Sequence, residues 1–147
     1  MTSIYDKCSR FDGLSTVTAP TANYDHYSTS LGNWRDTPVA VGGSYPDNKN
    51  VEHFEDGIWT IKADFPFVTD AISHYSMATL HDDLYLFGGS PTSEAGTLAT
   101  RYDGTIWINI GSMMQERYGH RSVVKGNVIY HIGGSYTKLV TNKLNRN

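Results

Sequence analysis

Six histidines are the residues of this 147-residue chain best suited to metal ligation or proton transfer, because imidazole changes charge near neutral pH and is a common metal ligand. His26, His74 and His120 each precede a glycine pair, and we interpret them as one repeated position. Equivalent residues on separate structural units would meet at a metal only around a central channel, so this recurrence favours a structural hydrogen bond. The other histidines match no zinc-binding spacing: His53, His81 and His131.

Acidic residues and the single cysteine give catalysis equally little support. Asp82 and Asp83 could form a carboxylate pair, but they lie in a predicted tight turn, where Asp is favoured by its hydrogen bonds to the backbone. Cys8 stands alone, which excludes an internal disulfide framework, and we interpret it as a small buried residue or an inert surface thiol. No serine-hydrolase, phosphate-loop or zinc-protease motif occurs. We therefore predict a chain that is not an enzyme and binds no metal or cofactor.

Composition limits the partners. The formal net charge is −3, and the lysines and arginines are scattered, so we expect neither a nucleic acid nor a membrane surface as the main partner. Hydrophobic residues make up 39% of the chain, enough for one globular core. No stretch has the length of a membrane span, and neither a signal-like leader nor a glycosylation sequon is found. This slightly favours a cytoplasmic location, while the compartment stays open.

Three glycine pairs organise the sequence: Gly42–Gly43, Gly88–Gly89 and Gly133–Gly134. Each ends a short apolar run, and the steps between the pairs are 46 and 45 residues. A fixed period of this size is the signature of a repeat architecture. An aromatic residue five positions before a tryptophan also recurs, as Phe54 before Trp59 and Tyr102 before Trp107.

Turn residues divide each repeat into four short strands. Asp-Gly pairs are strong hairpin signals, and here they separate the aromatic strand from the tryptophan strand: Asp12–Gly13, Asp56–Gly57 and Asp103–Gly104. Further turns are predicted between the histidine strand and the glycine-pair strand: Gly32–Asn33, His81–Asp83 and Gly126–Asn127. No long stretch holds a helical apolar period. Four antiparallel strands in about 45 residues form one blade of a β-propeller.

The repeated order of apolar run, glycine pair, aromatic residue and tryptophan resembles the kelch repeat, most closely in "MMQERYGHRSVVKGNVIYHIGG" (113–134). The resemblance implies that the glycine pair ends the second strand of each blade, against crowded neighbours. It also implies that Trp59 and Trp107 are buried between blades. We therefore predict an all-β fold of about three four-stranded antiparallel kelch-type blades, a half or partial propeller.

The predicted strands, labelled a to d within each blade, form a single domain over residues 1–147. A c–d pair at about 4–18 precedes complete blades at about 24–62 and 74–110, and a partial blade follows at about 119–145. The final "KLVTNKLNRN" could supply a weak strand c. Propellers need four to eight blades to close, so we expect either a fragment of a longer protein or a half-ring completed by a second copy. The N-terminal c–d pair, which the last blade lacks, favours the homodimer.

Recognition is expected on the face that carries the b–c loops (44–50 and 90–97) and the d–a loops (63–73 and 111–119), because variable loops on a rigid scaffold usually carry binding. We predict a non-catalytic protein-binding scaffold whose partner the sequence does not name. Phe67 has an equal alternative role, in which it seals the gap between blades with Phe65. The candidate contact residues are Tyr45, Asp47, Asn48, Phe67, Thr92, Glu94, Met114, Glu116 and Arg117.

The alternative is a glycan-binding or enzymatic propeller. Copper oxidases on kelch propellers use a tyrosine cross-linked to a cysteine, but Cys8 lies near the N-terminus and nothing marks a tyrosine partner. "YDGTIW" (102–107) weakly resembles the Asp-box of sialidases, although the upstream Ser-x of that box and a visible arginine triad are missing. In a glycan-binding propeller, Tyr and Trp side chains would stack on sugar rings.

Overall fold

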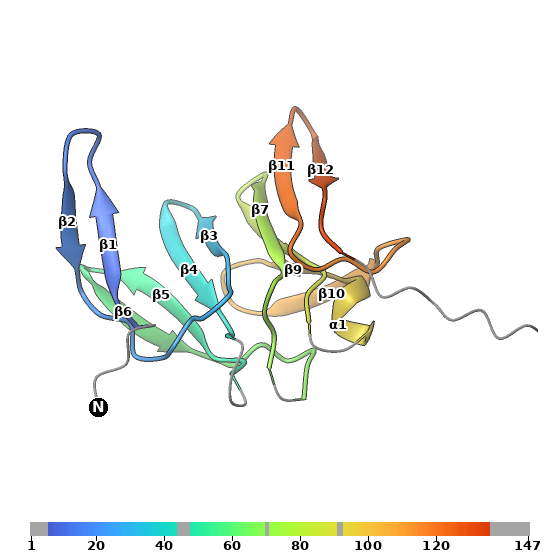
Figure 1. Cartoon of the computed structure of the whole chain (residues 1–147), viewed down its shortest axis with the longest axis horizontal. Coiled ribbons are helices and arrows are strands. Elements are labelled where there is room, and N and C mark those ends of the chain that lie inside the picture. Colours follow the sequence, from blue (N-terminus) through green and yellow to red (C-terminus); the bar gives the residue numbers. More distant parts are fainter. Residues whose placement is uncertain (1–5, 44–47, 70, 91–92, 136–147) are drawn as a thin grey trace, which may run out of the picture.

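The structure is a computed structural model of the chain and describes residues 6–43, 48–69, 71–90 and 93–135. Hairpins and small antiparallel sheets follow one another in chain order, from β1 and β2 at one end to β11 and β12 at the other (Figure 1). The described part contains no helix long and apolar enough to cross a membrane. The predicted all-β fold of short antiparallel blades is confirmed.

Two four-stranded sheets form the centre of this arrangement. Blade 1 has the order β3-β4-β5-β6, and blade 2 has the order β10-β9-β8-β7, so each is an up-and-down meander. The strands of blade 1 are β3 (Leu31–Trp34), β4 (Thr37–Val41), β5 (Val51–Glu55) and β6 (Ile58–Lys62). Those of blade 2 are β7 (Ser76–Leu80), β8 (Asp83–Phe87), β9 (Leu98–Tyr102) and β10 (Trp107–Ser112).

A two-stranded hairpin lies on each side of these blades. The N-terminal hairpin pairs β1 (Cys8–Phe11) with β2 (Thr16–Ala19), and the C-terminal hairpin pairs β11 (Arg121–Lys125) with β12 (Val128–Ile132). Within the described ranges, β1 and β12 each have one edge without a neighbouring strand. The possible strand c in "KLVTNKLNRN" (138–147) lies outside the described residues.

The hairpin turns follow the expected chemistry, with one correction. Asp56 and Gly57 both have positive φ, at 51° and 83°, which is the conformation of the tight hairpin turns that match strand twist. In blade 1 the a–b turn is at Arg35–Asp36 and not at the predicted Gly32–Asn33, which lies inside β3. Gly32 is needed there for packing, because a Cβ would lie 2.7 Å from a methyl carbon of Leu84 in blade 2.

One short helix, α1 (Ser93–Thr97), immediately precedes β9 and was not predicted. Its five residues are too few to show the apolar period by which helices are recognised in a sequence. It occupies part of the predicted b–c loop of blade 2 and so belongs to the same end of the blade as the glycine pair.

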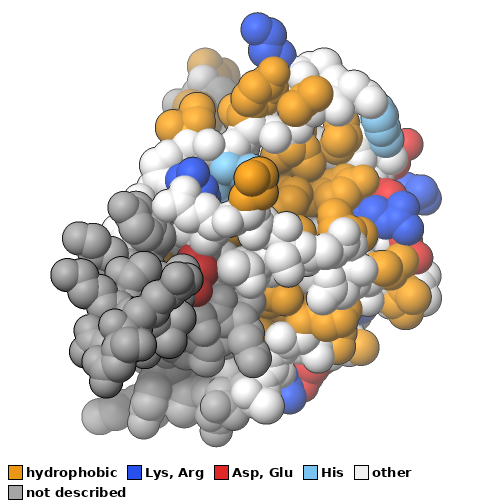
Figure 2. All heavy atoms as spheres, turned by 90° about the vertical axis from the view of Figure 1, so that its right-hand side faces the viewer, with side chains coloured by type: hydrophobic (Ala, Val, Ile, Leu, Met, Phe, Trp, Pro, Cys, Tyr) orange, Lys and Arg blue, Asp and Glu red, His pale blue; other side chains and the backbone are white. Residues whose placement is uncertain are grey.

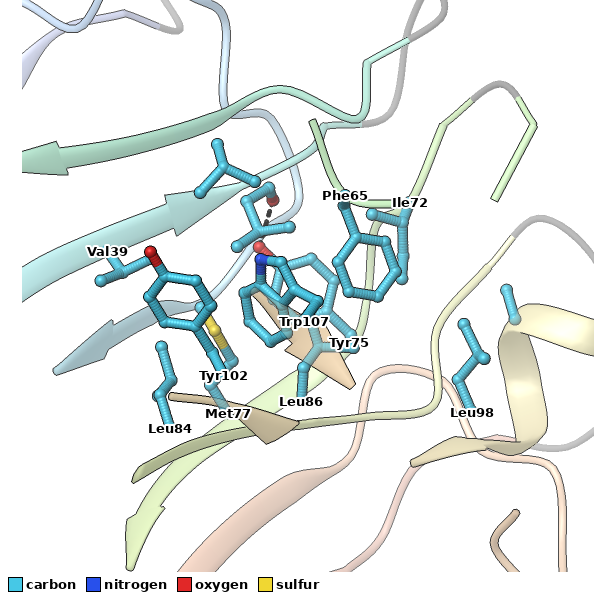
Figure 3. Packing of buried hydrophobic residues seen from close by; sticks show 13 residues of the cluster. Val39, Phe65, Ile72, Tyr75, Met77, Leu84, Leu86, Leu98, Tyr102 and Trp107 are labelled. Carbon is cyan, nitrogen blue, oxygen red and sulfur yellow. Dashed lines mark hydrogen bonds between the residues drawn. The ribbon is translucent and has the colours of Figure 1, made fainter. Parts of the chain in front are cut away.

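The main core lies between blade 1 and blade 2 (Figure 3). Val39 and Val41 of β4 face Leu84 and Leu86 of β8, and all four side chains are fully buried. Tyr75 joins them, and its hydroxyl donates a hydrogen bond to the Val41 carbonyl. Burial raises the pKa of this hydroxyl. These five residues are thus part of the apolar contact that holds the two blades together.

The two repeated tryptophans differ in burial. Trp107 of β10 is 8% exposed and packs against Phe65, at 5.1 Å between ring centroids, and against Tyr102, at 4.9 Å. Trp59 of β6 is only half-buried, so the prediction that both would be buried is wrong for Trp59. The difference has a positional cause: Trp107 packs against blade 1, whereas Trp59 faces the side where only the N-terminal hairpin precedes it.

Strand pairing defines which residues are equivalent. Val41 pairs with Val51, and Phe87 pairs with Ala99, so these pairs occupy the same place in their blades. Ile132 takes the place of Val41 and Phe87, because each of the three directly precedes a glycine pair. By the same logic, Phe11 of the N-terminal hairpin corresponds to Phe54 and Tyr102, since each begins an equivalent c–d turn.

Candidate functional site

The loops at one end of the blades are joined by backbone hydrogen bonds around the glycine pairs. The N–H of Gly43 donates to the carbonyl of Ile72, at 2.9 Å, and the N–H of Gly89 donates to that of Arg117, at 3.0 Å. Each bond links a glycine pair to the segment that enters the following blade. We call this end of the molecule, formed by the b–c and d–a loops, the glycine face.

A second set of backbone bonds connects the entry segments of successive blades. The N–H of His74 donates to the carbonyl of Ser28, and the N–H of Gly119 donates to that of His74, both at 2.7 Å. All three residues have positive φ, from 55° to 68°. They therefore occupy one repeated position. This corrects the sequence alignment: His74 is equivalent to Ser28 and Gly119, and not to His26 or His120.

His26 has the structural role that its sequence context suggested. Its Nδ1 lies 2.7 Å from the carbonyl oxygen of Gly42, and its Nε2 lies 3.0 Å from a carboxylate oxygen of Glu52. Arg117 occupies the equivalent position after blade 2, and its guanidinium donates to the carbonyl of Gly133 at 2.8 Å. In these two repeats a side chain at this position stabilises the glycine pair, whereas the repeat between them has the apolar Ile72 there.

His120 is a buried histidine in a cationic neighbourhood. Its side chain is fully buried, and neither ring nitrogen has a hydrogen-bond partner among the described residues. Burial, together with the nearby charges of His131, Arg117 and Arg121, lowers the pKa of His120 to about 4. The imidazole is therefore neutral near pH 7. No group of three or more His, Cys, Asp or Glu side chains in the described part is arranged to hold a metal ion.

The predicted contact residues have different fates. Met114 is fully exposed on the d–a loop after blade 2, and Glu116 and Arg117 beside it are half-buried. Phe67 is half-buried with its ring edge-on to Phe65, 5.6 Å away. Asn48 is 5% exposed, and its side-chain amide donates to the carbonyl of Asp25, so it is a structural residue and not a surface contact. Four further candidates cannot be placed: Tyr45, Asp47 and Thr92 lie outside the described residues, and the side chain of Glu94 is not described.

The loop that displays Met114 is fixed on both sides. The N–H of Met113 donates to the carbonyl of Thr97 at 2.8 Å, and the N–H of Arg117 donates to that of Gly96 at 2.9 Å. Both acceptors belong to the b–c loop of the same blade, so the two loops are joined. Gly96 and Thr97 belong to α1, so this short helix fixes the position of the d–a loop. An exposed apolar side chain is thus presented by a backbone held at two points.

Glu52 is a buried charge that sequence reasoning did not single out. Its side chain is fully buried in β5, and it accepts hydrogen bonds from the N–H groups of Asn23, at 3.0 Å, and Tyr24, at 2.9 Å. The amide of Asn23 and the ring of His26 complete the arrangement. The available signal was a carboxylate beside Val51 at a position where the equivalent residue of blade 2 is the uncharged Thr100. Glu52 fixes the segment that connects the N-terminal hairpin to blade 1.

Comparison with known proteins agrees with this architecture. No protein-family model matches the chain. Kelch-like protein 21 of Danio rerio is 32% identical over 85 residues, which cover 56% of this chain and 13% of that protein. The chain therefore spans about an eighth of the length of this relative.

A solved structure of YjhT resembles 90% of this chain with a TM-score of 0.74 and 16% sequence identity. The chain covers 45% of that protein, a little under half of its length. At this identity the likeness concerns the fold alone. The recurring glycine pairs, the antiparallel blades and the two likenesses together support a fold of kelch-type β-propeller blades.

Proposed function

We propose that this chain is a non-catalytic protein-binding scaffold that recognises its partner through the glycine face. The observation that carries the proposal is the d–a loop after blade 2, where Met114 is fully exposed between two backbone anchors at Met113 and Arg117. A loop that is already ordered loses little conformational entropy on binding. An unbranched thioether can also adapt its shape to an apolar partner surface.

The neighbouring residues fit the same role. Phe67 offers part of an aromatic ring, and Arg117 keeps part of its guanidinium accessible while it donates to Gly133. Aromatic residues, Met and Arg are enriched at protein interfaces, and aromatic residues and Arg often dominate binding energy. Tyr45, Asp47, Thr92 and Glu94 remain expected contacts on the adjoining b–c loops. The repeat supplies a rigid frame on which such loops can vary.

Peptides selected from a random displayed library would test binding at the glycine face. We expect the peptides that bind the wild-type chain to lose affinity for Met114→Asp and to bind Ile106→Asp normally. Ile106 is a matched control, because it is 56% exposed in the c–d turn of blade 2, at the opposite end of the strands. Equal losses in both variants, at unchanged melting temperatures, would contradict a role for the glycine face.

A glycan array would test the alternative of sugar binding with the same protein. Saturable binding of one glycan, unaffected by Met114→Asp, would replace the protein-binding proposal with recognition through Tyr or Trp side chains. We further propose that a second copy completes the propeller ring, so that the binding face is presented twice.

A further inference from the structure

The last glycine pair has the backbone of its counterparts, but within the described residues no further blade packs against it. Gly42, Gly88 and Gly133 have φ of 63°, 63° and 72°. A Cβ on Gly42 would overlap the carbonyl of Ile72, and one on Gly88 would overlap that of Arg117. A Cβ on Gly133 would meet no described atom within 4 Å. The pair at Gly133 is thus shaped for the backbone of a further blade.

The C-terminal hairpin also exposes the side chains that its counterparts bury. Ile132 is 67% exposed, whereas the equivalent Phe87 and Val41 are 8% and 0% exposed. Val123, Val128 and Tyr130 are about half exposed with it. Figure 2 views the molecule from the side on which β11 and β12 lie in Figure 1, and it shows hydrophobic side chains gathered there. This surface, which we call the forward face, corresponds to the blade 1 surface that packs on blade 2.

The complementary surface lies at the other end of the arc. A cavity of about 700 Å³ separates the N-terminal hairpin from blade 1. Its wall on blade 1 consists of residues whose equivalents in blade 2 are the core residues packed against blade 1. Thr29, Leu31, Pro38, Ala40, Phe54 and Trp59 line the cavity, in the places of Tyr75, Met77, Leu84, Leu86, Tyr102 and Trp107. The cavity is therefore an unfilled position for strands a and b.

Side-chain sizes on the two surfaces compensate. Between blade 1 and blade 2, Val39 and Val41 meet Leu84 and Leu86. In the forward face these valines are replaced by the larger Tyr130 and Ile132. In the cavity wall the two leucines are replaced by the smaller Pro38 and Ala40. Large residues opposite small ones preserve the total volume, which is what close packing of an interior requires.

The forward face and the cavity wall also carry opposite charges at positions that are in contact between blade 1 and blade 2. At the blade 1–blade 2 contact, the ring of Trp34 lies where a Cβ of Gly104 would be. The residues in those two places on the free surfaces are Lys125 at the end of β11 and Asp56 in the turn before β6. The substitution pairs an ammonium with a carboxylate where the internal contact pairs an indole with glycine.

We propose that the forward face of one copy fills this cavity in a second copy, with β12 pairing antiparallel to the partner's β1. This inference rests on the proposal that a second copy completes the ring. We apply the register of the Val41–Val51 and Phe87–Ala99 pairs to β12 and the partner's β1. Ile132 of one copy then lies opposite Cys8 of the other, and Tyr130 lies opposite Arg10. A twofold axis makes the contact occur twice and closes about six blades, within the usual range for propellers.

A designed disulfide tests this register. The N–H of Gly42 donates to the carbonyl of Asn50, and these two residues form the pair next to Val41–Val51. Val41 and Val51 are therefore a non-hydrogen-bonded pair, with an expected Cα separation of about 4.5 Å. That spacing suits a disulfide. Cys8 is the chain's single cysteine, so Ile132→Cys in the 147-residue chain should form a covalent dimer with Cys8 of the partner under mild oxidation. Val123→Cys is the control, because Val123 is also exposed on the same face, at 52%, but lies one strand further from the edge.

We expect most of the Ile132→Cys protein to migrate as a reducible dimer and the Val123→Cys protein to remain largely a monomer. Sedimentation of the wild type should give a dimer at micromolar concentration, and hydrogen exchange of the β1 and β12 amides should speed up on dilution. A wild-type monomer with dilution-independent exchange would overturn the proposal, even if Ile132→Cys fails to fold. A wild-type dimer in which folded Ile132→Cys does not cross-link would also overturn it. Either result leaves the peptide-binding test of the glycine face unaffected.

Discussion

The backbone carbonyl of Arg117 occupies the place where any other residue at position 88 would carry its Cβ. Gly88 also has a φ of 63°, a conformation that side-chain-bearing residues adopt at a cost. Both demands fall on the one position where blade 2 meets the segment entering the next repeat. The glycine pair is therefore a point of contact between repeats as well as a strand end.

Gly88→Ala should lower the free energy of unfolding by about 3 kcal/mol or more, because backbone strain and overlap with a rigid carbonyl add together. Gly57→Ala is the matched control, since Gly57 has a φ of 83° but a Cβ there meets nothing within 4 Å. Its loss should be about 1–2 kcal/mol from backbone strain alone. Urea unfolding measures both, and equal losses would remove the close-approach explanation.

The two tryptophans should differ in their effect on stability and in their accessibility to a quencher. Trp107→Ala should lower the free energy of unfolding by about 3–5 kcal/mol, as for other large buried aromatic residues. In variants that keep a single tryptophan, acrylamide should quench Trp107 weakly at every protein concentration. Trp59 should be quenched strongly in dilute solution and less strongly as concentration rises, because the proposed partner covers it. Concentration-independent quenching of Trp59 would argue against the closed ring.

The repeat and its turns were predictable because they rest on local chemistry. Glycine pairs at a fixed step and Asp56–Gly57 in a tight turn need only short-range rules. Gly32 misled the same rules, because its glycine is required by Leu84 from another blade and not by a turn. Histidine alignment failed for a related reason: the left-handed position is filled by Ser28, His74 and Gly119, which share a conformation but no chemistry.

The functional surface was less predictable than the fold. Asn48 and Met114 both lie in polar loops, and nothing in the sequence indicates that one is buried against the Asp25 backbone while the other is fully exposed. Burial in such loops depends on which segments of neighbouring repeats come together. Glu52 was overlooked because its donors lie 28 and 29 residues earlier in the chain, beyond any short-range pattern.

Glu52→Ala should destabilise blade 1 and loosen the segment that precedes it. Each N–H group of Asn23 and Tyr24 left without an acceptor would cost about 1–3 kcal/mol. We also expect faster proteolysis between residues 20 and 30. The control is Lys62→Ala, which removes the ammonium of the partly exposed Lys62–Glu55 pair, whose charged atoms lie 2.7 Å apart. That change should cost no more than about 1 kcal/mol, and a similar loss in both variants would show that Glu52 is not an anchor.

The buried imidazole of His120 should make stability depend on pH. Its folded-state pKa is lowered to about 4, so the unfolded chain binds a proton more readily than the folded chain between about pH 6.5 and pH 4. The free energy of unfolding should therefore fall as pH decreases through this window, by up to about 1.4 kcal/mol per pH unit from this group. Burial also lowers the pKa of His131, whose ring centroid lies 5.6 Å from that of His120. His131 therefore changes the free energy of unfolding in the same direction.

Replacing His120 with glutamine should flatten the pH dependence of stability between pH 6.5 and pH 4, whatever it does to stability at pH 7. The slope is the informative quantity, because a buried amide can destabilise the fold without changing proton binding. Urea denaturation at a series of pH values measures it for wild type and variant. His131→Gln should also reduce the slope, because burial lowers the pKa of the His131 imidazole in the folded chain as well. A His120→Gln protein with the wild-type slope would mean that His120 titrates alike in the folded and unfolded chains.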